Sequence, residues 1–144
     1  MRINDVLKGK PSQDVVTIKP DALVRDLLAL LTEHNVGALI VSTDGATVEG
    51  IVSERDIVRN LQADESILEG QVSAIMTSSV QTAEGTDQIT ALMQIMTDHR
   101  IRHVPVLTEG KLTGIISIGD VVKHRIGELE FERDQLDHYV HQTK

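Results

Sequence analysis

The chain has 144 residues, of which 40% are hydrophobic and 25% are charged, and its net charge is −8 at pH 7. This balance is typical of a globular protein with one compact domain or two very small ones, and the negative charge disfavours nucleic acid as a partner. Phe131 and Tyr139 are the only aromatic residues, so bases would find no aromatic platform on which to stack.

An internal repeat organises the chain. The segment GIVSERDIVR at 50–59 returns as GIISIGDVVK at 114–123, which is an offset of 64 residues. Upstream, LLTEHNVGALIV at 30–41 returns as IMTDHRIRHVPV at 95–106, which is an offset of 65. A match across a full unit with a single one-residue change in a turn indicates duplication.

The first unit begins with a short extended segment at 14–18, which Pro20 ends. Asp21 is then expected to cap a helix with leucines at helical spacing. Those leucines are Leu23, Leu27, Leu30 and Leu31. Two β-branched and almost continuously apolar strands follow at 38–42 and 48–52, and a helix closes the unit.

The second unit repeats this order. An extended segment at 79–83 ends at Gly85, and Thr86 is expected to cap the next helix. The apolar residues of that helix are Ile89, Leu92, Met93 and Met96. Strands are predicted at 103–107 and 112–116, followed by the closing helix. The order is therefore β-α-β-β-α twice, with residues 61–77 as the connection.

The closing helix of the second unit is predicted to run from Asp120 to about His141. Its apolar residues recur in steps of three and four, and Arg133 interrupts them. They are Val122, Ile126, Leu129, Leu136 and Val140. This stripe packs either on its own module or on a second copy. Because the stretch past Ile126 has no counterpart in the first unit, the sequence favours a homodimer contact.

These elements predict an α/β (α+β) fold of two units, about a pseudo-twofold axis, with an extended C-terminal helix. The predicted boundaries are 5–62 for the first unit, 63–78 for the linker, 79–125 for the second unit and 126–144 for the extension. A unit of about sixty residues is only marginally stable alone. We therefore expect the units to bury one sheet face against each other, around a central cleft that suits a small ligand.

Each unit carries a Gly-x-x-Ser-x-x-Asp segment at the junction between a strand and a helix. One interpretation is structural: Ser53 with Asp56, and Ser117 with Asp120, form capping boxes. The other uses the same geometry for a nucleotide, because a helix N-terminus attracts phosphate and a carboxylate can accept both hydroxyls of a ribose. Both interpretations stay open on these residues alone.

The duplicated unit, with GIVSERD at 50–56, GIISIGD at 114–120, IMTSSV at 75–80 and IRHVPV at 101–106, resembles a tandem pair of CBS domains over roughly residues 5–125. The resemblance implies a module with two clefts that binds an adenosine-containing ligand such as AMP, ADP, ATP, NAD(H) or S-adenosylmethionine. It assigns ribose binding to Asp56 and Asp120. The residues predicted to line the ligand are Thr17, Ile18, Lys19, Ser53, Arg55, Asp56, Thr82, Ala83, Arg102, His103, Pro105, Ile116, Ser117 and Asp120.

The two units carry different charge just before the strand that follows the first helix of each unit. Arg102 and His103 precede a strand of the second unit, and the repeat places Gly37 and Ala38 at the matching positions. Only the second unit therefore brings positive charge here, and the planar guanidinium of Arg102 suits a phosphate held by either half. A surface ion pair is the plainer interpretation of Arg102. We expect two unlike sites.

The sequence gives little support for catalytic, redox or metal sites. The absence of cysteine excludes disulfides, thiol catalysis and thiolate metal sites. There is no P-loop, no G-x-G-x-x-G and no nucleophile with an assigned base. Without a signal-peptide stretch or a membrane-length apolar run, we expect a cytoplasmic protein.

The sequence thus predicts a non-catalytic nucleotide sensor that acts on an unknown protein partner, without a required cofactor, metal, nucleic acid or membrane. The alternative is a ligand-free structural or protein-interaction module.

Overall fold

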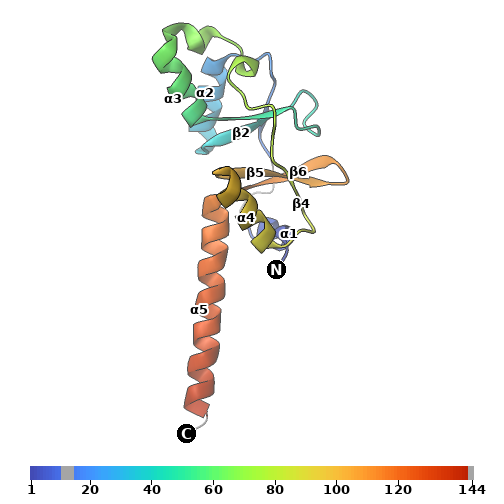
Figure 1. Cartoon of the computed structure of the whole chain (residues 1–144), viewed down its shortest axis with the longest axis vertical. Helices are drawn as coiled ribbons and strands as arrows, with labels where there is room; N and C mark the ends of the chain where they lie inside the picture. Colours follow the sequence, from blue (N-terminus) through green and yellow to red (C-terminus); the bar gives the residue numbers. More distant parts are fainter. Residues whose placement is uncertain (11–14, 143–144) are drawn as a thin grey trace.

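Two small three-stranded sheets form the framework of this computed structural model, which describes residues 1–10 and 15–142 (Figure 1). In each sheet the first strand runs parallel to the middle strand, and the third runs antiparallel to it. The strands of the first sheet are β1 (Thr17–Ile18), β2 (Ala38–Val41) and β3 (Gly50–Ser53). Those of the second are β4 (Ala83–Glu84), β5 (His103–Thr108) and β6 (Lys111–Ser117).

The predicted order of β-α-β-β-α in each half is confirmed, and three short elements are added to it. The helices are α1 (Ile3–Lys8), α2 (Val24–His34), α3 (Glu54–Ala63), α4 (Ile89–His99) and α5 (Ile118–Gln142). Two 3₁₀ turns, η1 (Glu65–Glu69) and η2 (Val72–Ala74), lie in the connection between the halves. The sequence analysis did not predict α1, η1 or η2. Asp14, the start of the first predicted extended segment, lies outside the described residues.

Two of the predicted helix caps are wrong. Asp21 and Thr86 do not cap α2 and α4, because the N-cap positions are Leu23 and Gln88. At each of these positions the backbone first forms a β-bridge to a distant segment, Leu23 with Gln71 and Gln88 with Arg2. A long-range backbone pairing therefore accompanies each helix start, and at α2 the N–H of Leu23 also donates to Asp26 Oδ2 at 3.3 Å.

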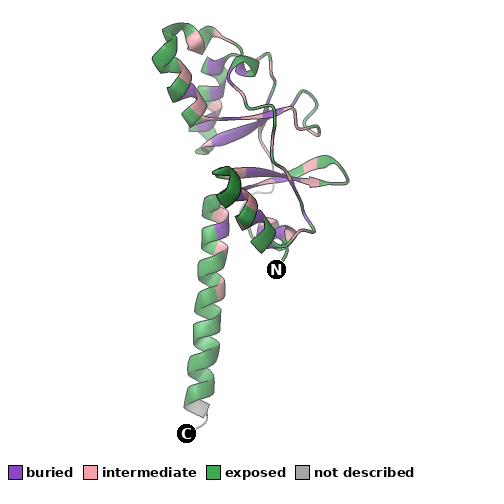
Figure 2. Cartoon of the chain, viewed as in Figure 1, coloured by how far each residue is buried: buried purple, intermediate pink, exposed green. Residues whose placement is uncertain are grey.

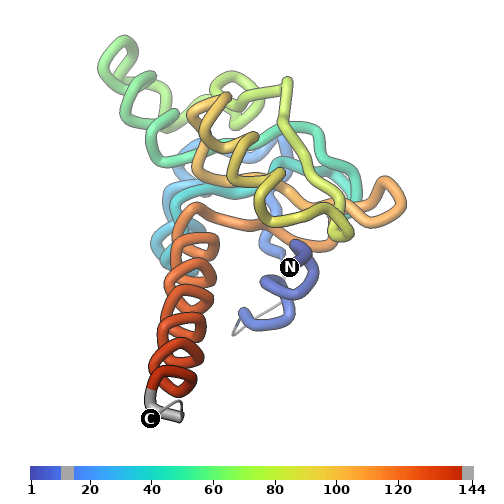
Figure 3. The backbone as a smooth tube through the Cα atoms, turned by 60° about the horizontal axis from the view of Figure 1, so that its bottom comes forward, coloured from blue at the N-terminus to red at the C-terminus, as the bar shows by residue number. Residues whose placement is uncertain are grey.

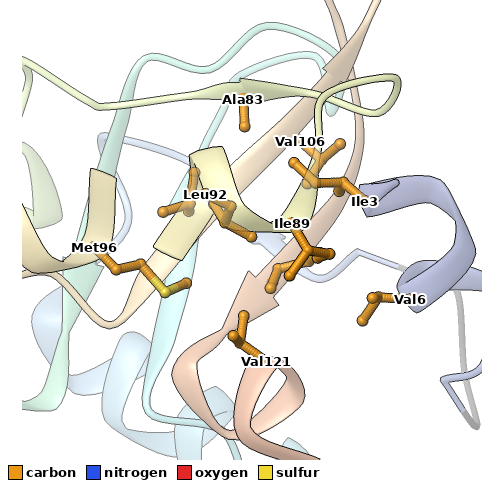
Figure 4. Close-up of a cluster of buried hydrophobic side chains, with 10 residues drawn as sticks. Ile3, Val6, Ala83, Ile89, Leu92, Met96, Val106 and Val121 are labelled. Atoms are coloured by element: carbon orange, nitrogen blue, oxygen red, sulfur yellow. The ribbon is translucent and has the colours of Figure 1, made fainter. Parts of the chain in front are cut away.

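Each half has its own hydrophobic core, and each core takes in a segment that is distant in sequence. Ile3 and Val6 of α1 pack into the core of the second half, although they begin the chain (Figure 4). Val72 and Ile75, which lie between the halves in sequence, pack into the core of the first half. In Figure 2 the buried residues of each half lie on its strands and on the helices packed beside them.

The second face of each sheet is covered by the other sheet. In β2, Leu39 and Val41 belong to the core, so Ala38 and Ile40 point to the opposite face, where Ile40 is fully buried. In β5 the same alternation puts Val104 and Val106 in the core and sends His103 and Pro105 to the opposite face. The two middle strands face each other across the junction in Figure 1. A hydrogen bond from Leu112 N to Ala46 O, 2.8 Å long, also joins the halves.

The long helix α5 leaves this body and extends well beyond it, as Figures 1 and 3 show. Its first turns pack on the second half, where Val121 is buried. Further along, the helix is exposed on every side (Figure 2). The single long helix predicted from the sequence is thus confirmed. None of the helices in the described part of the chain is long and apolar enough to cross a membrane.

We predict that Ile3→Ala destabilises the protein by about 2–5 kcal/mol, because it leaves a cavity in the core of the second half. The substitution lies three residues from the N-terminus, where a change in an unpacked tail would cost nothing. Unfolding in urea measures the effect. Val58→Ala on α3 is the control: Val58 is 67% exposed, so its change should stay within about 0.5 kcal/mol. Equal effects of the two substitutions would show that α1 does not pack into the core.

Candidate functional site

The two Ser-x-x-Asp motifs form matching caps at the N-termini of α3 and α5. Ser53 N donates a hydrogen bond of 2.8 Å to Asp56 Oδ2, and Asp56 N donates one of 3.4 Å to Ser53 Oγ. In the second half, Ser117 N donates to Asp120 Oδ2 at 2.9 Å, and Asp120 N donates to Ser117 Oγ at 3.1 Å. The predicted capping boxes are confirmed.

These caps leave one carboxylate oxygen unused in each half. Every hydrogen bond that the described residues give to Asp56 or Asp120 goes to Oδ2. Each Oδ1 is therefore an acceptor that the described residues do not occupy. A pair of vicinal hydroxyls is a suitable donor for such an oxygen.

The first turns of α3 and α5 offer fewer backbone donors than the sequence analysis assumed. The N–H of Glu54 donates to Gly37 O at 3.0 Å, and that of Ile118 donates to Arg102 O at 2.8 Å. Because the N–H groups of both aspartates are also bonded, those of Arg55 and Gly119 are the ones that the described residues leave available in the first three positions. A phosphate at either helix would meet one backbone donor there.

Lys10 distinguishes the second motif from the first. Its ammonium donates to Asp120 Oδ2 at 3.0 Å and to Ile115 O at 2.9 Å. Burial pushes the pKa of Asp120 upward, but the N–H of Ser117 and the ammonium of Lys10 together outweigh it and hold that pKa below its usual value. In the first half, the hydrogen bonds that the described residues give to the carboxylate of Asp56 both come from Ser53. None of the described residues therefore gives Asp56 a matching cation.

His103 lies at the junction between the two sheets. A Cβ atom on Gly37 would lie 3.5 Å from His103 Cε1 and 3.8 Å from Glu54 Oε1, so the imidazole occupies space that the glycine leaves open. Burial lowers the pKa of His103, although the carboxylates of Asp120 and Glu54 oppose that shift and the cations Lys10 and Arg102 add to it. The imidazole is therefore neutral near pH 7.

Strand alternation sorts the predicted ligand-lining residues into two groups. Ile18, Ala83 and Ile116 lie in the hydrophobic cores on the helical side of the sheets. Thr17 is paired with Ile40 in a parallel register, which places it on the face between the sheets. Ser53, His103, Pro105 and Ser117 share that face because they alternate with core residues. Thr82 is half-buried just before β4, and Lys19 is exposed just after β1.

Arg102 and His103 do not meet in one pocket. Arg102 is exposed and lines a pocket of about 610 Å³ at the start of α5, together with Gly119 and Lys123. A second pocket of about 610 Å³ contains Asp120 and Lys10 and lies between α1 and α5. His103 lines neither of the two. Arg55, the first-half counterpart of Gly119, is exposed.

Three residues of this region were missed from the sequence: Lys10, Glu54 and the functional meaning of Gly37. Glu54 and Gly37 could have been found from the sequence, because Glu54 adjoins the first motif and Gly37 matches Arg102 in the repeat. Lys10 had none, because it is 110 residues from Asp120 and lies outside the matched segments of the repeat.

The chain resembles known proteins over almost its whole length. The CBS domain family matches residues 3–63 and 72–127. The chain is 36% identical over 146 residues to the CBS domain-containing protein CBSX3, mitochondrial, of Arabidopsis thaliana, covering 96% of this chain and 71% of that protein.

Solved structures give the same result. A CBS-domain containing protein from Agrobacterium tumefaciens is similar with a TM-score of 0.82 and 42% identity, over 87% of this chain and 99% of that one. A CBS domain protein from Pyrobaculum aerophilum complexed with AMP is similar with a TM-score of 0.75 and 30% identity, over 83% and 89% of the two chains.

We predict that His103 makes the fold less stable in mild acid. Its folded pKa lies below its unfolded pKa of about 6.5, so the unfolded chain binds more protons in the window between those values. The free energy of unfolding should therefore fall as the pH decreases from above 6.5 through that window. Urea unfolding at several values between about pH 5 and pH 8 measures it. In His103→Gln this part of the pH dependence should disappear, and equal slopes in both proteins would contradict the prediction.

Proposed function

Because the chain belongs to the CBS domain family, we propose that it is a non-catalytic regulatory module that binds an adenosine-containing nucleotide between its two CBS units. The proposed ligands are AMP, ADP, ATP or NAD(H). The observation that carries this proposal is the pair of capping carboxylates, each with Oδ1 left open beside the junction of the two sheets. The similarity to a solved CBS domain protein complexed with AMP supports it.

In the proposed complex, the ribose hydroxyls donate to Oδ1 of Asp56 or Asp120 while Oδ2 keeps its capping bonds. The helix start does not have to rearrange, so the site is preformed. Thr17, half-buried on the face between the sheets, is positioned to contact the base. Aliphatic contacts to the base suit a chain with two aromatic residues.

The phosphate is proposed to lie on the positive side of the second half. Arg102 and Lys123 line the pocket at the start of α5, next to the available N–H of Gly119. A guanidinium, an ammonium and a backbone N–H together suit a phosphate. Lys10 offers a further ammonium beside Asp120. His103 does not line this pocket and is neutral at pH 7, so it is not proposed as a cation for the phosphate.

Binding would act on the packing of the two units. A nucleotide held by residues of both sheets favours the arrangement in which those residues are correctly spaced, and thus shifts the population of states. His103 lies at the contact through which such a shift passes. We propose that a homodimer passes this state to a protein partner, and that the protein is cytoplasmic.

The Lys10 contact favours a second candidate, a module that mediates protein interactions without a ligand. In this candidate the ammonium of Lys10 and the N–H of Ser117 already satisfy the charge of Asp120. Both motifs are then helix caps only.

Nucleotide binding by Asp56→Asn and Asp120→Asn distinguishes the two candidates. At about 100 times its dissociation constant, a ligand stabilises the wild type by about 2.7 kcal/mol, which raises the unfolding midpoint by roughly 5–15 °C. Asparagine keeps an oxygen for the cap but loses the charge. The affinity for AMP, ADP, ATP or NAD(H) should therefore fall about 10- to 150-fold in the variant whose cleft is used. Isothermal titration calorimetry measures the affinities.

Asp26→Asn is the matched control. Asp26 holds the same position in the first turn of α2, where Oδ2 accepts from Leu23 N at 3.3 Å, but it is exposed and belongs to neither motif. Its substitution should leave the affinity unchanged. A wild type that shows no midpoint shift with any of these nucleotides, or equal affinity in all four proteins, would refute the nucleotide site and favour the ligand-free module.

A further inference from the structure

The helix α5 carries several large apolar side chains that its own module leaves exposed. Val122, Ile126 and Leu129 are about half exposed, and Leu136 is 62% exposed. The packing of α5 on its own module uses a different face, because Val121 is buried and His124 and Glu128 are half-buried there. The expectation that the stripe could pack on its own module is therefore wrong.

The uncovered residues follow a heptad pattern. With Ile126 at position a, the positions alternate a and d along the helix, in steps of three and four. We call this set the α5 seam: Val122, Ile126, Leu129, Arg133, Leu136 and Val140. It spans about 27 Å of helix. Phe131 is also exposed, at 65%, but it lies opposite the seam and lines the groove beside α1.

Charge is distributed unevenly along the same helix. Residues 118–127 carry two basic side chains and one acidic one, whereas residues 128–142 carry one basic and five acidic ones. Two copies of α5 that run in opposite directions therefore place the basic start of each against the acidic end of the other. Parallel copies place like charges together.

We propose that two copies of this chain associate through the α5 seams as an antiparallel coiled coil. The register that matches the seam to itself pairs Val122 with the partner's Val140, and Ile126 with the partner's Leu136. Lys123 and the partner's Asp137 then flank the seam at facing e positions, where an ion pair can form.

Arg133 selects this direction. In a parallel dimer the two Arg133 side chains meet in one core layer, and two guanidiniums there repel each other and lose water. In the antiparallel register each Arg133 lies against the partner's Leu129, close to the partner's Glu130. Within its own helix Arg133 has a single ion-pair contact, 3.9 Å to Asp134, and its side chain is 71% exposed, so it is available to the partner.

The oligomeric state of seam variants tests the proposal. The wild type should sediment at twice the 15.8 kDa mass of the chain, and the double variant Leu129→Gln/Leu136→Gln should sediment as a monomer. Glutamine keeps the helix propensity of leucine, so α5 itself should persist. Phe131→Gln is the control, because it removes an exposed apolar side chain of the same helix outside the seam, and it should remain a dimer. A monomeric wild type, or a dimer in the double variant, would overturn the proposal.

Cysteine cross-linking then tests the direction, and the natural chain contains no cysteine to interfere. Under oxidation, Ile126→Cys alone should give no disulfide-linked dimer, whereas an equimolar mixture of Ile126→Cys and Leu136→Cys should give one. Cross-linking of Ile126→Cys to itself would show parallel helices and refute the antiparallel arrangement.

This arrangement refines the proposed homodimer and does not rest on the nucleotide site. The double variant at the seam should still bind nucleotide if Asp56 or Asp120 does, and Asp120→Asn should still dimerise. The two proposals can therefore fail independently, and these experiments give a different result for each failure. If the wild type is monomeric and its seam is protected from hydrogen exchange only when another protein is added, the partner is not a second copy.

Discussion

The burial of both faces of two very small sheets is the constraint on which this structure depends. Each sheet has three strands, and β1 and β4 have two residues each, so neither half could form an independently stable layer from backbone pairing alone. Helices cover one face of each sheet, and the opposite sheet covers the other. Ile40, fully buried yet outside both helical cores, shows that the face between the sheets is also buried.

The same contact creates the candidate site and makes it unequal. Duplication brings the two Ser-x-x-Asp caps to equivalent places beside the junction, while Gly37 and Arg102 differ at the matched position. Since Gly37 has no side chain, the imidazole of His103 fits against it, and the junction acquires a group that burial keeps neutral. Lys10 adds a second difference, because it pairs with Asp120, whereas none of the described residues gives Asp56 a matching cation. The surroundings of the two caps therefore differ in charge although the backbone of the unit repeats.

The caps show how one geometry can serve both structure and the proposed binding. Each carboxylate is already oriented by the N–H that one of its oxygens accepts, and the described residues leave its other oxygen available. If the proposed site is used, a substitution at either aspartate affects both stability and recognition. The long seam of α5, in contrast, contributes little to its own module, since its apolar residues stay about half exposed or more.

The sequence by itself determined the repeat, the order of the strands and helices, the two capping boxes and the extent of α5. All of these depend on patterns within a few residues, such as alternation in strands, steps of three and four in helices, and the Ser-x-x-Asp spacing. Tertiary structure alone decided that Ile3 packs into the second core, that bridges from Arg2 and Gln71 accompany the starts of α4 and α2, and that Lys10 reaches Asp120. These contacts join residues about 50 to 110 positions apart, and no local pattern records them, because only the packing of distant segments around each core brings such residues together.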